Sequence, residues 1–557
     1  MLKRMSKATS LLVAVAAIIS IVPASAADYK KIDSQEGIVY NAVAYKDGKF
    51  YIDGEVNNQD DGAYYLANGK YNNLSDVDSG SSVEAYGSKY LNVQAGDYFV
   101  DLDNGSVTDD SIKDNAKDDT ASALRKNVKK DTDGRYTVAD SQTIKTLTGK
   151  ELTGNKFTDL WYGVTYAADE ATNGNATSLN VYTDAKGKYI DADYNLGLIK
   201  VTTNNGSTEK SVAVSNTNDK YDGAGGTKTV TASVAVDGIN EKVIGQDANY
   251  IYRTAKVTIT ATAGTITKIN GKAISAPVFS TPGTAQTTFT VIQKISKAQA
   301  SDNINGAKYA KSVTTYVISK DNGDAIDENH SLLSKYTVSN GKLINYTVGA
   351  SSVQIETIVL SSKNGYYYTD INDKANEDAT IVDTDANGNI WRLMGGYIYK
   401  WNNDENWTKV YKVDGSFNKM SVYDDNNIVA WNKNDEVYSV IGGQATTTPT
   451  TPTTPVVNKG WVKTNTGWTF YNATGAQVKG QWVNDGGVWY MIKVDGIMAT
   501  GWYNDNGTWY FLQSSGAMKT GWLNDNGTWY YLNASGAMLA NTIVDGYKLG
   551  ASGAWIK

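Results

Sequence analysis

The chain has 557 residues, a formal net charge of −7 and no cysteine. Disulfide bonds and thiol catalysis are therefore excluded, and so acidic a chain is a poor candidate for binding nucleic acid. Glycine and tyrosine are abundant, proline is scarce, and apolar residues come in short alternating runs between turn residues. This composition predicts an all-β fold, and the length predicts several domains.

The N-terminus has the pattern of a secretory signal peptide over residues 1–26. Lys3, Arg4 and Lys7 precede an apolar run from Leu11 to Val22, and small residues follow at 24–26. The run of about 12 residues is shorter than the roughly 20 that a membrane span needs. We therefore expect cleavage after Ala26, a secreted protein, and no transmembrane segment in the mature chain.

Residues 27–443 contain alternating strands such as KTVTASVAV and AKVTITATA. One helix is predicted near 110–130, because Ile112, Ala116, Ala121, Leu124 and Val128 fall near one stripe. We expect three parts in this region. Residues 27–205 form a β-rich part with that helix, residues 206–330 a β-sandwich-like part, and residues 331–443 an aromatic, blade-like β part.

The run DANGNIWRLMGGYIYKW, residues 385–401, resembles the strand-and-turn motif of β-propeller sensor blades. A similar rhythm near residues 63–93 suggests that the two ends of the N-terminal region close one propeller-like unit. The turn from Asp383 to Asn389 also matches the opening of a calcium loop, but its twelfth position is Met394 instead of an acid. We therefore favour a turn that enters a blade, and we predict no metal site.

A Thr/Pro tract at 444–458 has no apolar periodicity and is typical of an extended linker. After it, residues 459–557 repeat a unit of about 20 residues that holds two Trp residues seven positions apart. Each copy carries a turn such as NDGG or NDNG between short aromatic strands, which predicts a tight β-hairpin. A single hairpin cannot bury its own face, so we expect the copies to stack as a solenoid.

Nine of the 14 Trp residues lie in this array. Some of them must be core, because Leu, Ile and Val are few there. A cluster of Trp and Tyr with Met beside it also suits a cage whose ring faces hold a quaternary ammonium group. The run GWYNDNGTWYFLQSSGAMKTGWLNDNGTWYYLNASGAM resembles the choline-binding repeat of pneumococcal-type surface proteins and lysins, and the tail ANTIVDGYKLGASGAWIK resembles the capping end of such arrays.

The resemblance implies that each choline lies between consecutive hairpins, enclosed by the two Trp residues of one repeat, an aromatic residue of the next, and a Met. Carried onto this chain, the resemblance implies a first cage of Trp461, Trp468 and Tyr490 and a second of Trp482, Trp489, Tyr510 and Met498. It implies a third cage of Trp502, Trp509, Tyr530 and Met518 and a fourth of Trp522, Trp529 and Tyr547. Met538, at the end of the last full copy, is a further choline-binding residue.

The first repeat departs from this pattern, with Thr469 where the other copies have Tyr and Val478 where they have Met. The first cage is therefore expected to match the family least. Related repeats in clostridial toxins and glucan-binding enzymes bind sugars, so a sugar is the alternative ligand.

The resemblance implies a surface protein of a Gram-positive bacterium, held non-covalently at the cell wall by choline on teichoic or lipoteichoic acid, or by other wall carbohydrate. No cofactor is expected. The single histidine, His330, cannot supply the two or more His ligands of zinc amidases, and no GxSxG motif accompanies it. We therefore expect a non-catalytic N-terminal region. The alternative is a wall-targeted hydrolase that uses two carboxylates.

Overall fold

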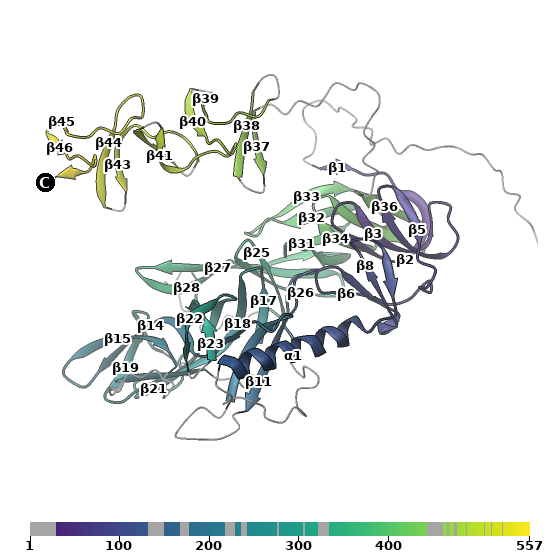
Figure 1. Cartoon of the computed structure of the whole chain (residues 1–557), viewed down its shortest axis with the longest axis horizontal. Coiled ribbons are helices and arrows are strands. Elements are labelled where there is room, and N and C mark those ends of the chain that lie inside the picture. The colour runs from purple at the N-terminus through teal and green to yellow at the C-terminus, as the bar shows by residue number, and fades with distance from the viewer. Residues whose placement is uncertain are drawn as a thin grey trace, which may run out of the picture. The chain divides into compact units, whose positions relative to one another are not determined.

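The computed structural model describes residues 29–131, 150–167, 178–217, 229–234, 242–275, 278–304, 307–320 and 333–442, and, in the array, 460–464, 467–472, 476–485, 487–505, 507–513, 515–525 and 527–556. The predicted signal peptide, the predicted Thr/Pro linker and His330 lie outside these residues. The chain divides into two compact units, Met1–Thr446 and Thr447–Lys557. Strands dominate both units, so the predicted all-β, multidomain fold is confirmed (Figure 1).

The predicted helix is present as α1 (Ile112–Asp131). Its buried face consists of Thr120, Ala121, Leu124 and Val128, and its last two residues before Asp131 are lysines that complement the helix dipole. The face packs against a six-stranded sheet in the order β10-β11-β12-β13-β23-β22. In the described residues, no helix has the length and apolar character needed to cross a membrane. The strands of this sheet are β10 (Lys150–Glu151), β11 (Trp161–Ala167), β12 (Ser178–Asp184), β13 (Tyr189–Asp191), β22 (Gln299–Ile304) and β23 (Ala307–Ala310).

Two sheets pack on each other in the middle of the first unit. A four-stranded sheet, β15-β14-β19-β20, packs on strands of a ten-stranded sheet through a core that includes Ile199, Val201, Val257, Ile259 and Val291. Hydrogen-bonded sheets run across residues 205 and 330, because β14 pairs with β15 and the ten-stranded sheet continues from β24 into β28. The strands are β14 (Asn195–Asn204), β15 (Glu209–Asn216), β16 (Val230–Val234), β17 (Lys242–Gln246), β18 (Tyr250–Ala261), β19 (Thr265–Ile269), β20 (Lys272–Ala273), β21 (Gln286–Ser296), β24 (Val313–Val317), β25 (Lys335–Ser339), β26 (Lys342–Val348), β27 (Ser352–Lys363), β28 (Tyr366–Ile371) and β29 (Ala375–Asp378).

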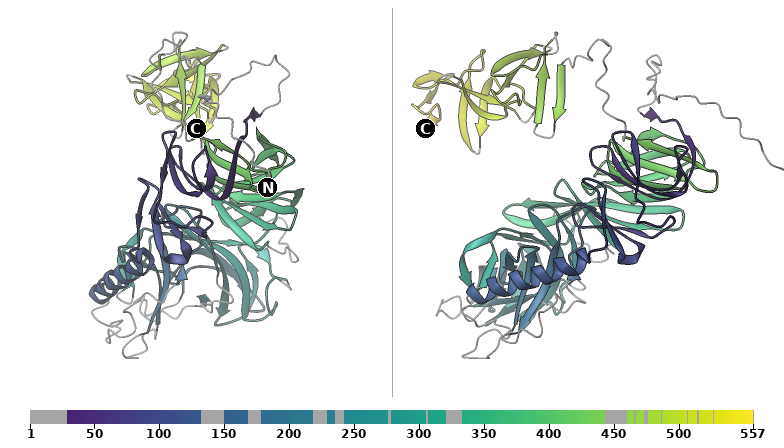
Figure 2. Two further views of the ribbon diagram at one scale, coloured as in Figure 1. Left: turned by 90° about the vertical axis from the view of Figure 1, so that its right-hand side faces the viewer. Right: turned by 45° about the vertical axis from the view of Figure 1, so that its right-hand side comes forward.

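Strands from the two ends of the first unit are joined by hydrogen bonds (Figure 2). The first residues of β2 pair with β36, and β1 pairs with β33. Strands β30 to β33 follow one another as an antiparallel meander, which is the strand order of a blade. The strands are β1 (Lys30–Lys31), β2 (Gln35–Tyr45), β3 (Lys49–Val56), β4 (Gly62–Ala67), β5 (Lys70–Asn73), β6 (Val83–Tyr86), β7 (Tyr90–Val93), β8 (Tyr98–Asp101), β9 (Ser106–Thr108), β30 (Ile381–Thr384), β31 (Ile390–Met394), β32 (Tyr397–Trp401), β33 (Trp407–Lys412), β34 (Lys419–Asp424), β35 (Asn427–Asn432) and β36 (Val437–Ile441), with a 3-10 turn at Gln94–Gly96.

The second unit is a row of hairpins, as the repeat predicted. In the turns of the third and fourth hairpins, Asn504 and Asn524 accept hydrogen bonds from the amides of Gly507 and Gly527, at 2.9 and 2.8 Å. Both glycines have positive φ, which explains the NG sequence. The hairpins are β37 (Gly460–Thr464) with β38 (Gly467–Tyr471), β39 (Gln481–Asp485) with β40 (Val488–Ile492), β41 (Gly501–Asp505) with β42 (Thr508–Leu512), and β43 (Gly521–Asp525) with β44 (Thr528–Leu532), followed by a three-stranded end of β45 (Thr542–Val544), β46 (Tyr547–Leu549) and β47 (Trp555–Ile556).

The turn before β31 is organised around the buried carboxylate of Asp385. Its oxygens accept hydrogen bonds from the amides of Asn387 and Asn389, from Asn389 Nδ2 and from Trp391 Nε1, at 2.8 to 2.9 Å. Burial raises the pKa of Asp385, and these hydrogen bonds oppose the shift. The carboxylate serves donors of its own turn and strand, as expected for a turn entering a blade. The described residues hold no group of three or more potential metal ligands.

We predict that Asp385→Ala lowers the free energy of unfolding by about 3 kcal/mol, because it leaves the buried Trp391 indole N–H and the Asn389 amide without acceptors. Urea denaturation of the mature protein measures the change. Asp60 is exposed, so Asp60→Ala is the matched control and should stay within about 0.5 kcal/mol of wild type. Equal stability of the two variants would show that Asp385 does not hold this turn.

Candidate ligand cages of the C-terminal array

Each hairpin presents its two Trp residues on one face, and the second, third and fourth hairpins present a Tyr on the other. In the third hairpin, Trp502 lies opposite Phe511 and Trp509 lies opposite Asn504, whereas Tyr510 lies opposite Tyr503. Side chains alternate between the two faces of a strand, so both Trp residues share a face and Tyr510 points to the other. A cage between two hairpins can therefore take its Trp pair from one and its Tyr from the next.

The rings meet across the hairpin interfaces in this way. In the first three copies, the ring centroid of the first Trp lies 4.7 to 4.8 Å from that of the Tyr in the next hairpin. The pairs are Trp461 with Tyr490, Trp482 with Tyr510 and Trp502 with Tyr530. The planes cross at 61° to 70°. The two Trp rings of one repeat are also nearly perpendicular, at 81° for Trp502 and Trp509. Three rings at steep angles form three walls of an open box.

The second Trp of each copy keeps much of its surface in contact with solvent. The exposed fractions are 43%, 44%, 43% and 40% for Trp468, Trp489, Trp509 and Trp529. The first Trp of each copy is only partly exposed. A pure core role would bury both rings, so the recurring exposure of the second Trp indicates a surface for a ligand.

Hydrogen bonds between neighbouring repeats fix the first Trp. Its Nε1 donates to an Asp at the tip of the next hairpin, from Trp461 to Asp485 at 3.0 Å and from Trp482 to Asp505 at 2.9 Å. Trp502 donates to Asp525 at 2.9 Å in the same way. The bond satisfies the indole N–H and places a carboxylate at each of the first three interfaces, which favours a cationic ligand there.

The Met residues belong one interface earlier than the sequence grouping placed them. The amide of Met498 donates to the carbonyl of Trp468 at 2.7 Å, and that of Met518 donates to Trp489 at 2.8 Å. Met538 bonds Trp509 in the same way. The resemblance, carried onto this chain, placed Met498 and Met518 with the Trp pair of their own repeat, but the segment that carries each Met folds back against the preceding hairpin.

The first cage is complete, contrary to the expectation from its unusual repeat. Thr469 occupies the position of the Tyr, so it belongs to the face that points away from the Trp pair. It is fully buried and accepts a hydrogen bond from Gln477 Nε2 at 2.8 Å. The first cage takes its Tyr and Met from the second repeat, as Tyr490 and Met498, and the departures at 469 and 478 do not affect it.

The fourth cage has a residue that the sequence analysis missed. Trp555 pairs with Leu549 as Met538 pairs with Leu532. It lies 5.4 Å from Tyr547, which in turn lies 5.4 Å from Trp522. Trp555 therefore replaces the Met, and the walls of this cage are all aromatic. The signal was the match between ASGAM, residues 534–538, and ASGAW, residues 551–555.

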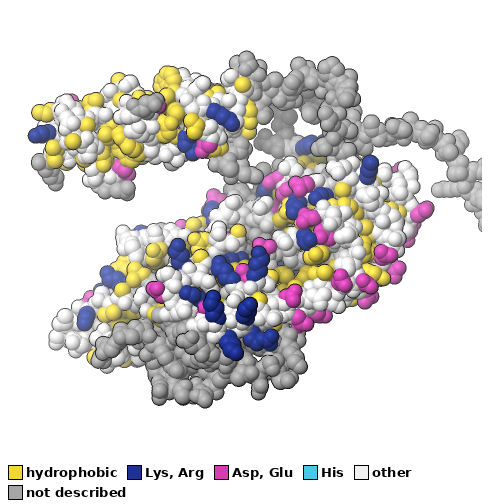
Figure 3. Space-filling model, viewed as in Figure 1, with side chains coloured by type: hydrophobic (Ala, Val, Ile, Leu, Met, Phe, Trp, Pro, Cys, Tyr) yellow, Lys and Arg dark blue, Asp and Glu magenta, His cyan; other side chains and the backbone are white. Residues whose placement is uncertain are grey.

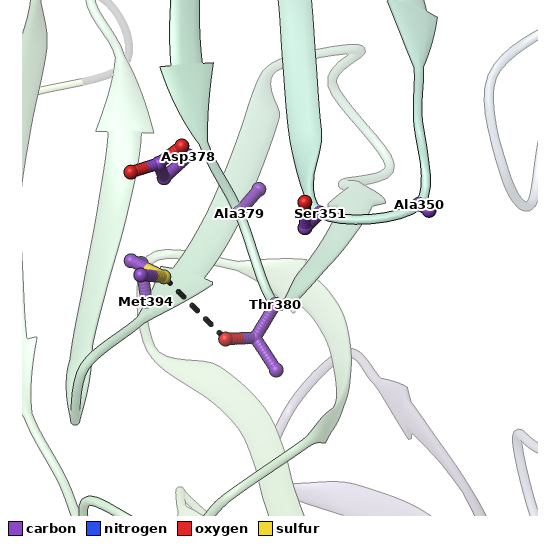
Figure 4. Close-up of a pocket in the computed structure, with 6 residues that line it drawn as sticks. All are labelled: Ala350, Ser351, Asp378, Ala379, Thr380 and Met394. Atoms are coloured by element: carbon purple, nitrogen blue, oxygen red, sulfur yellow. Dashed lines mark hydrogen bonds between the residues drawn. The ribbon is translucent and has the colours of Figure 1, made fainter.

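The first unit has a hollow and a carboxylate pair that could compete as sites. A surface hollow of about 420 Å³ is lined by Ala350, Ser351, Asp378, Ala379, Thr380 and Met394. Figure 4 shows the Thr380 hydroxyl donating to the Met394 sulfur, at 3.6 Å, and Asp378 as the only carboxylate drawn. One carboxylate does not meet the two-carboxylate requirement of a glycosidase.

Asp53 and Asp61 come close together elsewhere in the unit. The hydroxyl of Ser79 contacts both Asp53 and Asp61. Asp53 is fully buried, burial raises its pKa, and its two oxygens accept the amide of Gly80 at 2.9 and 3.0 Å. These bonds hold the turn at 79–80, and the burial of Asp53 closes it to a polymeric substrate.

We predict that Gly516→Ala disturbs the first cage. An added Cβ would lie 2.1 Å from the sulfur of Met498, and Gly516 has a φ of +83°. Gly507 is the matched control, because its φ is +93° but nothing lies within 4 Å of the added atom. Both variants carry backbone strain of about 1 to 3 kcal/mol. Only Gly516→Ala should also weaken ligand binding; equal binding by the two variants would show that Met498 is not a cage wall.

Comparison with known proteins agrees with this geometry. A profile of the choline-binding repeat matches residues 499–542. The choline-binding domain of Spr1274 from Streptococcus pneumoniae is 44% identical over 14% of this chain and 96% of that domain, with a TM-score of 0.14. CbpJ of the same organism is 24% identical over 45% of this chain and 66% of its own, with a TM-score of 0.17.

A phage Cp-1 endolysin complexed with choline is 32% identical over 19% of this chain, with a TM-score of 0.15. The chain spans only 30% of that endolysin. No relative was found among curated protein sequences. Through its C-terminal repeats, the chain belongs to the choline-binding repeat family.

Proposed function

We propose that this chain is a secreted surface protein which its array holds at the cell wall by binding choline on teichoic or lipoteichoic acid. The observation that carries the proposal is the fourfold recurrence of a box with steeply crossed aromatic walls and an exposed Trp face. A trimethylammonium group keeps its charge at any pH and has no N–H to donate. Contact with ring faces is the interaction suited to it.

The composition of the walls favours choline over a sugar as the ligand. A sugar presents hydroxyl groups, each of which needs a polar partner when it is enclosed. The cage walls are Trp, Tyr and Met, and the indole N–H groups of Trp461, Trp482 and Trp502 are already donated to aspartates. The polar groups needed to orient a sugar are therefore few.

Several weak cages on one array give firm retention on a polymer with many choline groups. Once one cage is filled, the remaining cages meet choline at a high effective concentration. Release by free choline is expected for the same reason, because a monomeric competitor removes each contact separately. This behaviour fits an anchor better than a single tight site.

We further propose that the first unit is displayed by the anchor and is not catalytic, with adhesion or a structural role in the wall as its function. The commitment of Asp53 to Gly80 and Ser79 supports this, since a general acid or base must reach its substrate. The alternative is a wall-targeted hydrolase. One of the proteins similar to part of this chain is an endolysin, so the alternative needs an experimental test.

We predict that the mature protein binds a choline-derivatised resin, is released by free choline, and is not released by glucan oligosaccharides. Trp509→Ala should weaken retention about 2- to 30-fold, because the loss of a ring face costs about 0.5 to 2 kcal/mol. Val494→Ala is the control, since Val494 is 82% exposed on the same array. Release by glucan oligosaccharides but not by choline would show that the ligand is a sugar. Equal retention of both variants would show that Trp509 has only a structural role.

We predict that the mature protein creates no new reducing ends or free amines in purified cell walls, and that His330→Ala changes nothing. Heat-treated protein is the control for spontaneous release. New reducing ends would establish a glycosidase and overturn the proposal. New amines would show that an amide bond is cut without the usual metal or thiol.

A further inference from the structure

A group of exposed lysines lies on the first unit. Lys126, Lys129 and Lys130 project from the C-terminal half of α1, and Lys186 and Lys188 from the turn between β12 and β13. All five are exposed. Among the described residues, their ammonium groups have no ion pair, hydrogen bond or ring contact. Figure 3 shows Lys and Arg side chains gathered over this part of α1. We name these five residues the α1 lysine surface.

The helix and the turn form one fixed surface. Asn127 Nδ2 donates to the carbonyl of Gly187 at 2.8 Å, and the Thr120 hydroxyl lies 3.2 Å from the carbonyl of Ala185. A Cβ on Gly187 would lie 2.4 Å from the amide nitrogen of Leu124, so the turn is in close contact with the helix backbone. The two groups of lysines are therefore held next to each other.

The acidic residues of this region do not neutralise the lysines. Asp131 accepts the hydroxyl of Tyr189 at 2.9 Å. Asp184 Oδ1 accepts the amides of Lys186 and Lys188, both at 2.9 Å. Both carboxylates are thus engaged with donors other than the lysine side chains.

Stabilisation of the helix accounts for only part of this charge. Lys129 and Lys130 lie in the last turn of α1, where a cation interacts favourably with the helix dipole. Lys186 and Lys188 lie on a different element and gain nothing from that dipole. Like charges held close together repel one another. In a chain with a net charge of −7, five clustered lysines that have no partner among the described residues indicate a surface for an anion.

We propose that the α1 lysine surface binds a flexible polymer of phosphodiesters, the backbone chemistry of the teichoic acid that carries choline in the proposed function. The inference rests on the proposed function only for the identity of that polymer. None of the exposed large apolar side chains of the described residues lies on α1 or on this turn, so there is no side chain to insert into a lipid surface. Repeated phosphates instead match repeated ammonium groups.

The test uses the full mature protein in excess free choline, which occupies the cages, and a choline-free poly(glycerol phosphate) as the probe. Five phosphate contacts should make binding about 100-fold weaker between 50 and 200 mM salt, with roughly 0.7 counterions released per contact. The variant K126Q/K129Q/K130Q retains two contacts. Its affinity for the polymer should be at least about 10-fold lower than that of wild type at 50 mM salt. Between 50 and 200 mM salt its affinity should fall only about 7-fold.

The matched control is K70Q/K335Q/K419Q, which removes the same charge from exposed lysines on separate strands. It should bind the polymer as wild type does. Equal loss in both triple variants, or no binding by wild type at 50 mM salt, would overturn the proposal. Stronger binding to phosphatidylglycerol vesicles than to the polymer would assign the surface to a membrane instead. Retention on choline resin should be the same for all three proteins. A loss of polymer binding can therefore be distinguished from a loss of choline binding by the array.

Discussion

The contact between a Trp ring on one hairpin and a Tyr ring on the next determines both the stability of the array and its ligand site. An isolated hairpin of this length is marginally stable in water, so each depends on its neighbours. The ring contacts at 4.7 to 4.8 Å supply that interface. The same rings are the walls of the cages, so the structural contact and the binding site are one arrangement of side chains.

This double role has a thermodynamic consequence. A ligand that binds the stacked array but not separated hairpins stabilises the stack in proportion to its occupancy. Glycines maintain the close spacing, since Met498, Met518 and Met538 pack on Gly516, Gly536 and Gly553 where no Cβ would fit. The ends of the array differ because each has only one neighbour. Thr469 fills a face that points away from the first cage, and Trp555 closes the last one.

Sequence reasoning succeeded where the determining contacts are local. The NG turns between short aromatic strands predicted the hairpins, and the resemblance to choline-binding repeats implied the ring pairs. The helix was predicted from its apolar stripe. The grouping of Met498 failed, because the direction in which its segment folds back is not encoded in the spacing. Trp555 was missed because the final copy is shorter than the others.

In the first unit, the sequence suggested strands and turns but could not specify their partners. The pairing of β2 with β36 joins residues about 400 positions apart, and no local pattern determines such a register. The α1 lysine surface depends in the same way on a turn that lies some 60 residues beyond the helix. Asp385 was correctly read as part of a turn, since Asx turns and tight glycines leave a local signature.

Binding stoichiometry tests the central claim most directly. Equilibrium dialysis or calorimetry of choline with the mature protein should give four sites per chain, one for each interface from Trp461 to Trp555. Trp555→Ala should leave three unaltered sites. Saturable binding at four sites, reduced in this way, would establish the cages as the geometry describes them. No saturable binding of choline to folded protein would contradict the account, and an unchanged stoichiometry and affinity in Trp555→Ala would remove Trp555 from the fourth cage.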